Sequence, residues 1–150
     1  MPTIKPRRKR RPRSKVVVQR AAGTAPAAAL LRKYALAASL PGSRVTLRVV
    51  GTAEGRLLNS TFRRRNYSTN VLSFSYGRRH GDLVLCHPVI RKEAQEQRKS
   101  LAAHYAHLIV HGMLHLRGED HLRTSDAARM ERREIRILRR AGIRDPYAVE

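Results

Sequence analysis

The part of the sequence most suited to chemistry is the segment HGMLHLRGEDH, which contains His111, His115 and His121. On a helix, His111 and His115 are four residues apart, so both imidazoles project from the same face, one turn apart. This separation allows both rings to bind one cation at about 2.0–2.1 Å from each nitrogen. Gly118 can adopt a left-handed conformation that turns the chain back, so that His121 arrives as a third ligand. The spacing therefore predicts a metal site at the end of a helix.

Three neutral imidazoles suit a borderline transition metal such as zinc, and they are equally compatible with nickel, cobalt or iron. A structural zinc site closes with four protein ligands, whereas three protein ligands leave a position for water. Zinc lowers the pKa of that water to about 7, which makes a nucleophile available at neutral pH. We therefore predict one catalytic Zn²⁺ per chain and no small-molecule cofactor.

Four further residues have side chains that could bind a metal ion. His104 and His107 lie on the preceding turns of the same expected helix, where we expect hydrogen-bonding support or ordinary packing rather than metal binding. Asp120 is compatible with a fourth ligand or with a hydrogen-bonding role outside the ligand set. Cys86 follows an apolar run, so we predict a buried structural thiol.

The same histidine spacing occurs in the metzincin metalloproteases, which carry a glutamate directly after the first histidine as general base. Gly112 occupies that position here. Without a carboxylate, peptide hydrolysis lacks the group that deprotonates water and reprotonates the leaving amine. A phosphodiester needs less help of this kind, so a metallopeptidase is the weaker interpretation.

The charge of the chain favours a polyanionic substrate. Its 150 residues include 32 Lys and Arg against 11 Asp and Glu, for a net charge of +21, and the first acidic residue is Glu54. Such a chain attracts phosphates through counterion release, which predicts RNA as the partner and makes an anionic membrane surface the weaker alternative. No apolar run approaches the roughly 18 residues of a membrane span. With one cysteine and no signal-peptide pattern, we expect a cytoplasmic protein.

The elements that must position these residues follow from local patterns. Residues 1–20 contain nine Lys and Arg, three prolines and no acid, which predicts a disordered basic arm ahead of a single domain over 21–150. Apolar periodicity and stop signals predict helices and strands beyond the arm. Helices are expected over 27–40, 53–62, 88–99, 101–116 and 124–140, and strands over 44–50, 71–74 and 82–86. The succession predicts an α+β fold with a small mixed sheet packed with about five helices, and the metal site at the end of a central helix.

Several further blocks give the chain a family resemblance. They are LNSTFR at 58–63, STNVLSF at 68–74, GDLVLC at 81–86, KEAQEQ at 92–97, the segment from Ala103 to His121, and DPY at 145–147. Together they resemble the bacterial YbeY endoribonucleases, also called rRNA maturation factors, over about residues 44–147. Glu119 stands where an aromatic residue is common in that family, and the basic arm is not part of its pattern.

The resemblance implies a single-strand-specific, metal-dependent endoribonuclease that matures rRNA, notably the 3′ end of 16S rRNA, and acts in ribosome quality control. It implies that His111, His115 and His121 hold the metal and that Arg63 shares their cleft as a catalytic residue. A guanidinium there can bind two phosphate oxygens and offset charge in the transition state. The implied partners are rRNA and the small ribosomal subunit or its assembly factors. A non-catalytic ribosome-assembly protein with a structural metal remains the alternative.

Overall fold

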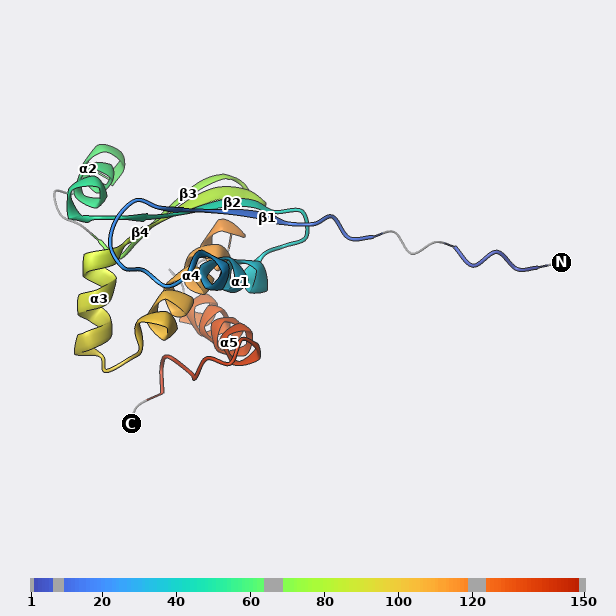
Figure 1. The fold of residues 1–150 in the computed structure, drawn as a ribbon. Coiled ribbons are helices and arrows are strands. Elements are labelled where there is room, and N and C mark those ends of the chain that lie inside the picture. The colour runs from blue at the N-terminus through green and yellow to red at the C-terminus, as the bar shows by residue number, and fades with distance from the viewer. Residues whose placement is uncertain (1, 7–9, 64–68, 119–123, 149–150) are drawn as a thin grey trace.

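The computed structural model describes residues 2–6, 10–63, 69–118 and 124–148. Within these ranges the chain forms a four-stranded mixed sheet and five helices, which confirms the predicted α+β class (Figure 1). The element order is β1 (Lys15–Arg20), α1 (Ala28–Ala38), β2 (Arg44–Val50), α2 (Thr52–Arg63), β3 (Val71–Gly77), β4 (His80–Cys86), α3 (His87–Glu96), α4 (Leu101–Leu116) and α5 (Thr124–Arg140).

The strands lie in the order β1-β2-β4-β3. β1 and β4 both pair in parallel with β2, whereas β3 and β4 form an antiparallel hairpin. The register places Lys15 beside Arg44 and Arg44 beside His80, so the three parallel strands begin at one edge of the sheet.

The first strand corrects one prediction. We expected residues 1–20 to be a disordered arm, but Lys15–Arg20 form β1, so the prediction was wrong for these six residues. Val16 is buried beneath α1, and the Lys15 amide donates to the Ser43 carbonyl at 2.7 Å. Pairing with β2 satisfies the backbone and buries a valine, which outweighs the repulsion between neighbouring basic side chains. Pro12 and Ser14 also bond to the connection between α1 and β2, because the Gly42 amide donates to the Pro12 carbonyl at 3.1 Å and the Ser14 hydroxyl donates to the Leu40 carbonyl at 2.9 Å. The arm therefore remains a prediction only for the residues before Pro12.

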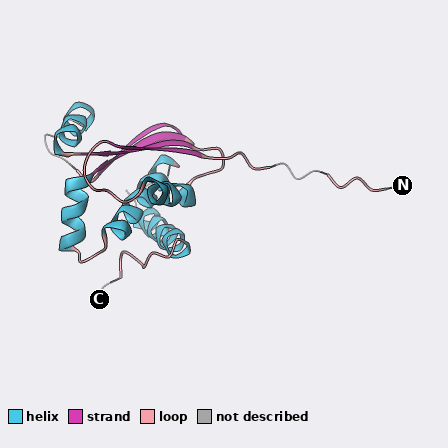
Figure 2. Ribbon diagram, viewed as in Figure 1, coloured by secondary structure: helices cyan, strands magenta, loops and turns pink. Residues whose placement is uncertain are grey.

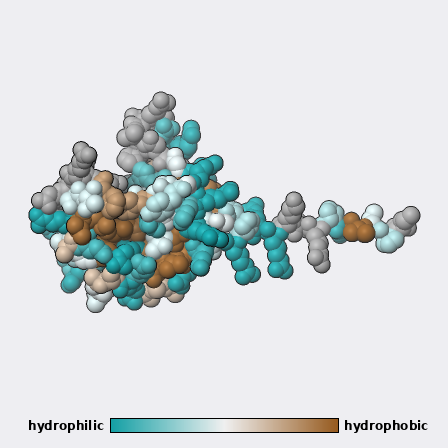
Figure 3. Space-filling model, turned by 90° about the horizontal axis from the view of Figure 1, so that it is seen from above, coloured by the Kyte–Doolittle hydropathy of each residue, from teal (hydrophilic) through white to brown (hydrophobic). Residues whose placement is uncertain are grey.

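The two faces of the sheet are covered unequally. Helices α1 and α4 pack on one face, called here the inner face, with α5 behind α4 (Figures 1 and 2). On the other, outer face, α2 covers only one end of the sheet. Seen from the side of α2, hydrophobic residues gather in limited areas among hydrophilic ones (Figure 3). Most of the buried apolar side chains therefore belong to the inner face, and the predicted buried thiol of Cys86 lies in the small outer cluster.

Helix α4 is the central helix of the fold, with the bounds that the sequence predicts. Ser100 begins it, because its hydroxyl oxygen accepts a hydrogen bond from the Ala103 amide at 3.1 Å. Gly118 follows its end with a φ of +90°, a conformation that favours glycine. A Cβ atom on Gly112 would lie 2.8 Å from Leu83 Cδ2, so the glycine lets α4 approach β4 closely. None of the helices in the described ranges is long and apolar enough to cross a membrane.

Candidate metal centre

The central feature of the site is the pair of imidazoles that α4 presents on one face. The Nε2 atoms of His111 and His115 lie 3.0 Å apart, and the ring centroids are 4.6 Å apart. Two nitrogen ligands of one tetrahedral ion, each at about 2.0–2.1 Å from it, would be roughly 3.3 Å apart. The two nitrogens therefore converge on one point, and the geometry fits a shared transition-metal ion.

A groove of about 460 Å³ opens beside this pair. One wall is α4, with His111 and His115, and the other is formed by the start of β3 and the residues before it. The β3 wall is polar because Thr69, Asn70, Ser73 and Ser75 line it. A ligand in this groove would meet hydroxyl and amide groups on one side and the two imidazoles on the other.

On its opposite edge, the His111 ring meets a buried carboxylate. Glu134 of α5 is 0% exposed, and its Oε1 atom forms a short hydrogen bond with His111 Nδ1. Its Oε2 atom accepts a hydrogen bond from the Tyr147 hydroxyl at 2.5 Å and lies 3.5 Å from His107 Nε2. Both oxygens of the carboxylate therefore have partners, which is the condition for burying such a group.

The environment of Glu134 keeps it ionised. Burial by itself raises the pKa of the carboxyl, but hydrogen bonds from His107, His111 and Tyr147 outweigh burial and lower the pKa to about 2. Burial and the hydrogen bond to Glu134 raise the pKa of the Tyr147 hydroxyl, which therefore stays protonated as a donor. At neutral pH the carboxylate acts only as an acceptor toward these groups.

A second set of donor atoms also meets the requirements of a metal site. His107, His111 and Glu134 offer one ligand atom each, all within 4.8 Å of one another. His111 thus stands between two sets, with His115 beside its Nε2 atom and Glu134 beside its Nδ1 atom. In metal sites a histidine binds the ion through one ring nitrogen and donates its other N–H group to a carboxylate or carbonyl. The group of His107, His111 and Glu134 can hold a metal ion, whereas the sequence predicted a site formed by His111, His115 and His121 and a supporting or packing role for His107.

The structure brings together only some of the predicted site residues. His111 and His115 meet as the spacing requires, whereas His121 and Asp120 lie outside the described residues. Arg63 is the last residue of α2, and its side chain is not among those described. His104 is away from the pair and 3% exposed, with Nε2 at 3.4 Å from Glu93 Oε1. Desolvation lowers the pKa of His104, which suits the packing role that we expected.

Sequence analysis missed Glu134 and Tyr147, although each left a signal. Glu134 interrupts the buried stripe of α5 formed by Met130, Ile137 and Leu138. A carboxylate at such a position needs a buried partner, because an unpaired charge there would be costly. Tyr147 belongs to the DPY block that carries part of the family resemblance.

The fold and the site define a class of small α+β proteins with a histidine-rich helix that can hold a metal ion. The family model described as Endoribonuclease YbeY matches residues 13–142, and the chain belongs to this family. The predicted resemblance is therefore confirmed.

Individual relatives agree with the family assignment. A protein of Aromatoleum aromaticum is 51% identical over 141 residues, covering 89% of this chain and 92% of its own length. One of Bordetella pertussis is 51% identical over 127 residues, covering 77% and 81% respectively, and both are named Endoribonuclease YbeY. The solution structure of TM1509 from Thermotoga maritima has the same fold, with a TM-score of 0.60, 18% identity, and coverage of 85% of this chain and 92% of that one.

Proposed function

We propose that this protein is a metal-dependent endoribonuclease specific for single-stranded RNA, with His111, His115 and His121 as the metal ligands. The observation that carries the proposal is the convergence of the His111 and His115 Nε2 atoms beside a polar groove, in a chain of the Endoribonuclease YbeY family. The nitrogen donors suit zinc better than magnesium, which prefers oxygen. When bound, such an ion polarises a phosphate oxygen and lowers the pKa of water.

The residues of the chain have separate tasks in this proposal. The groove wall at Thr69, Ser73 and Ser75 offers hydroxyl groups that hydrogen-bond phosphate or ribose oxygens and place the strand against the imidazoles. Arg63 binds two phosphate oxygens and offsets the negative charge that grows as the phosphodiester is attacked. Gly112 leaves no general-base carboxylate on the helix and lies against Leu83, which favours a nuclease over a peptidase.

Substrate choice in this proposal depends on context more than on base reading. The net charge of +21, the exposed Arg78 and Arg79 of the β3–β4 turn, and the arginines of α5 hold RNA through its phosphates. The chain has no Trp and only two Phe and five Tyr for stacking on bases. We therefore propose rRNA processing in the cytoplasm, at the 3′ end of 16S rRNA and in ribosome quality control. The small ribosomal subunit or its assembly factors would supply specificity.

The test is cleavage of a precursor 16S rRNA fragment with a single-stranded 3′ extension. His115→Ala and Arg63→Ala should each lower the cleavage rate by at least about 100-fold, because a metal ligand and a phosphate-binding cation are lost. RNA binding, measured by filter retention, should stay within a few-fold of wild type. The matched controls are the exposed His80→Ala and Arg91→Ala, which should cleave normally. Normal cleavage by both site variants would refute the assignment.

Metal removal separates the enzyme from the alternative of a non-catalytic assembly protein with a structural metal. Elemental analysis of the purified protein identifies the ion, and a chelator then removes it. A catalytic ion should be needed for cleavage while far-UV circular dichroism still shows a folded chain. Unfolding on chelation, with no metal-dependent cleavage before it, would favour the structural alternative.

A further inference from the structure

We propose that Glu134 and Tyr147 are positioning residues, which hold the His111 ring so that its Nε2 atom faces the groove. The inference rests on the proposed function, since it concerns how a metal ligand is prepared. Glu134 acts on His111 directly, and Tyr147 acts through Glu134.

The first step is the unusual place of Glu134. It is fully buried in the apolar stripe of α5, where a leucine or methionine would fill the space without the cost of desolvating a charge. The partners of its carboxylate are two imidazoles and a phenol. A buried carboxylate in contact with His107 and His111 of α4 is better explained by its effect on those histidines than by a contribution to stability.

The second step is the proton on His111. A carboxylate oxygen accepts the hydrogen bond that a ring N–H group donates, so the contact between Glu134 Oε1 and His111 Nδ1 favours the ring hydrogen on Nδ1. In the neutral ring the lone pair is then on Nε2, which faces His115 Nε2 at 3.0 Å. The carboxylate thus selects the tautomer that can bind a metal from the groove side, and it makes the ligand more basic.

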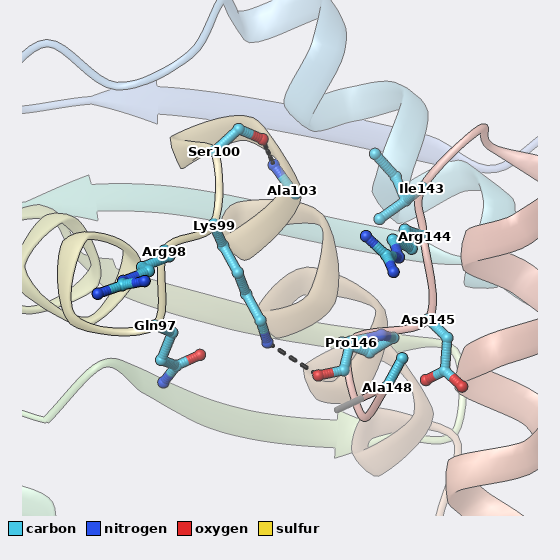
Figure 4. Close-up of a pocket in the computed structure, with 10 residues that line it drawn as sticks. All are labelled: Gln97, Arg98, Lys99, Ser100, Ala103, Ile143, Arg144, Asp145, Pro146 and Ala148. Carbon is cyan, nitrogen blue, oxygen red and sulfur yellow. Dashed lines mark hydrogen bonds between the residues drawn. The ribbon is translucent and has the colours of Figure 1, made fainter. Parts of the chain in front are cut away.

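The third step is the chain beyond α5. Tyr147 donates to Glu134 Oε2 and packs edge-on against the His107 ring, with centroids 5.2 Å apart. The segment that carries it is tied to the α3–α4 connection, because Lys99 Nζ donates to the Pro146 carbonyl at 3.0 Å (Figure 4). The Tyr147 amide also donates to Asp145 Oδ1 at 2.8 Å. These bonds place the tyrosine where it holds the second oxygen of the carboxylate and so aims the first one at His111.

A direct role for Glu134 as a ligand, with His107 and His111, is the competing arrangement. It would need His111 Nδ1 to face the ion, which would leave the His115 nitrogen outside the ligand set. Glu134 is 0% exposed and the His107 side chain 15%, so an ion among them would be shielded from substrate. The groove lies beside His111 and His115, which favours positioning over ligation.

The test measures zinc affinity without RNA, by competition with a chromogenic chelator. Glu134→Met removes the acceptor at similar volume, Glu134→Gln keeps one acceptor oxygen, and Tyr147→Phe removes only the hydroxyl. We expect zinc affinity to fall by about 10–100-fold in Glu134→Met, with smaller losses in the other two variants. The matched controls are Glu131→Gln, an exposed carboxylate on the same helix, and Tyr76→Phe, whose hydroxyl bonds the distant Asp82. Both controls should bind zinc as wild type does.

Two readouts separate positioning from a structural role. Glu134→Met should bind zinc weakly at a temperature at which circular dichroism shows the zinc-free variant folded, although its melting temperature should fall because His107, His111 and Tyr147 lose their shared acceptor. Long-range ¹⁵N–¹H spectra of the histidines should show His111 as the Nδ1–H tautomer in zinc-free wild type. Glu134→Met should lose that preference, and Glu134→Gln should keep part of it.

The outcomes distinguish this inference from the proposed function. Unchanged zinc affinity in Glu134→Met and Tyr147→Phe, with weak binding in His115→Ala, would overturn positioning and leave the metal centre standing. Loss of zinc in His107→Ala and Glu134→Gln, with normal binding in His115→Ala, would make Glu134 a ligand and overturn positioning. A wild-type protein that binds no zinc or other transition metal would refute the metal centre and this inference with it.

Discussion

The two faces of the sheet differ in how completely helices cover them. On the inner face, Leu47, Val49, Leu83 and Leu85 of β2 and β4 are completely buried beneath α1 and α4. On the outer face, the buried cluster is small and lies near α2, while Val17 and Tyr76 are 40% and 62% exposed. The helix that fills the inner core also carries His111 and His115. The packed core therefore holds the site rigidly. The sparsely covered outer face could not provide this support.

The largest expected effect is on the free energy of unfolding. It is the difference between truncating an apolar side chain of α4 and truncating one of α2. Ile109 of α4 is completely buried, so Ile109→Ala should lower the free energy of unfolding by about 2–5 kcal/mol. Leu57 of α2 is 62% exposed, so Leu57→Ala should change it by no more than about 0.5 kcal/mol. Urea unfolding of the metal-free protein measures both. Equal losses would mean that the outer face is as much a core as the inner one.

A smaller effect is expected where α4 meets β4. Gly112→Ala would place a Cβ atom 2.8 Å from Leu83 Cδ2 and 3.0 Å from Leu83 Cδ1, and Leu83 is itself completely buried. The clash should cost about 1–3 kcal/mol, partly offset by the higher helix propensity of alanine, worth about 1 kcal/mol. Zinc affinity should fall as well, since the neighbouring His111 would shift.

A double-mutant cycle identifies the cause of that loss. Leu83→Ala removes the atoms that the new Cβ would meet, so Gly112→Ala should cost less in the Leu83→Ala background than in wild type. If the two losses simply add, the contact between α4 and β4 is not what requires glycine at position 112.

The contrast between the faces also explains what the sequence could reveal. The bounds of α4 and the meeting of His111 with His115 follow from local patterns: a cap, a periodic apolar stripe and a four-residue spacing. The strand expected over 44–50 likewise agrees with β2, in which the alternating Val45, Leu47 and Val49 are buried. Where the relation is local, sequence and structure agree.

The two features that the sequence did not reveal are β1 and the role of Glu134. Both depend on partners that are distant in the sequence. In β1, three valines follow a run of basic residues and prolines, and their pairing with β2 joins residues about 30 positions apart, which no local pattern reveals. The role of Glu134 was missed because its partners His111 and Tyr147 lie on two other segments. The family resemblance indicated the histidines and Arg63, but the groups that the Glu134 carboxylate contacts become visible only when α4, α5 and the C-terminal segment are seen together.

The smallest expected effect is on the pH dependence of stability, and it distinguishes a buried histidine from an exposed one. His87, at the start of α3, is 4% exposed, and its Nδ1 atom lies 2.7 Å from the Tyr105 hydroxyl. Burial, and then the positive charge of Arg91, lowers the pKa of His87 below its usual value of 6.5. The unfolded chain therefore takes up a proton near pH 6.5, while the folded chain does so only at lower pH. The free energy of unfolding should accordingly fall as the pH drops below about 6.5.

His87→Gln should remove this contribution, so its melting temperature should fall less than that of wild type between pH 7.5 and pH 5.5. The exposed His80→Gln, at the start of β4, should follow the wild-type curve, because this substitution leaves the burial of His87 unchanged. Differential scanning calorimetry of the metal-free proteins at a fixed ionic strength measures the difference. If the two variants show the same acid dependence, burial beside Tyr105 does not set the protonation of His87. The buried histidine would then affect the acid dependence of stability no more than the exposed one.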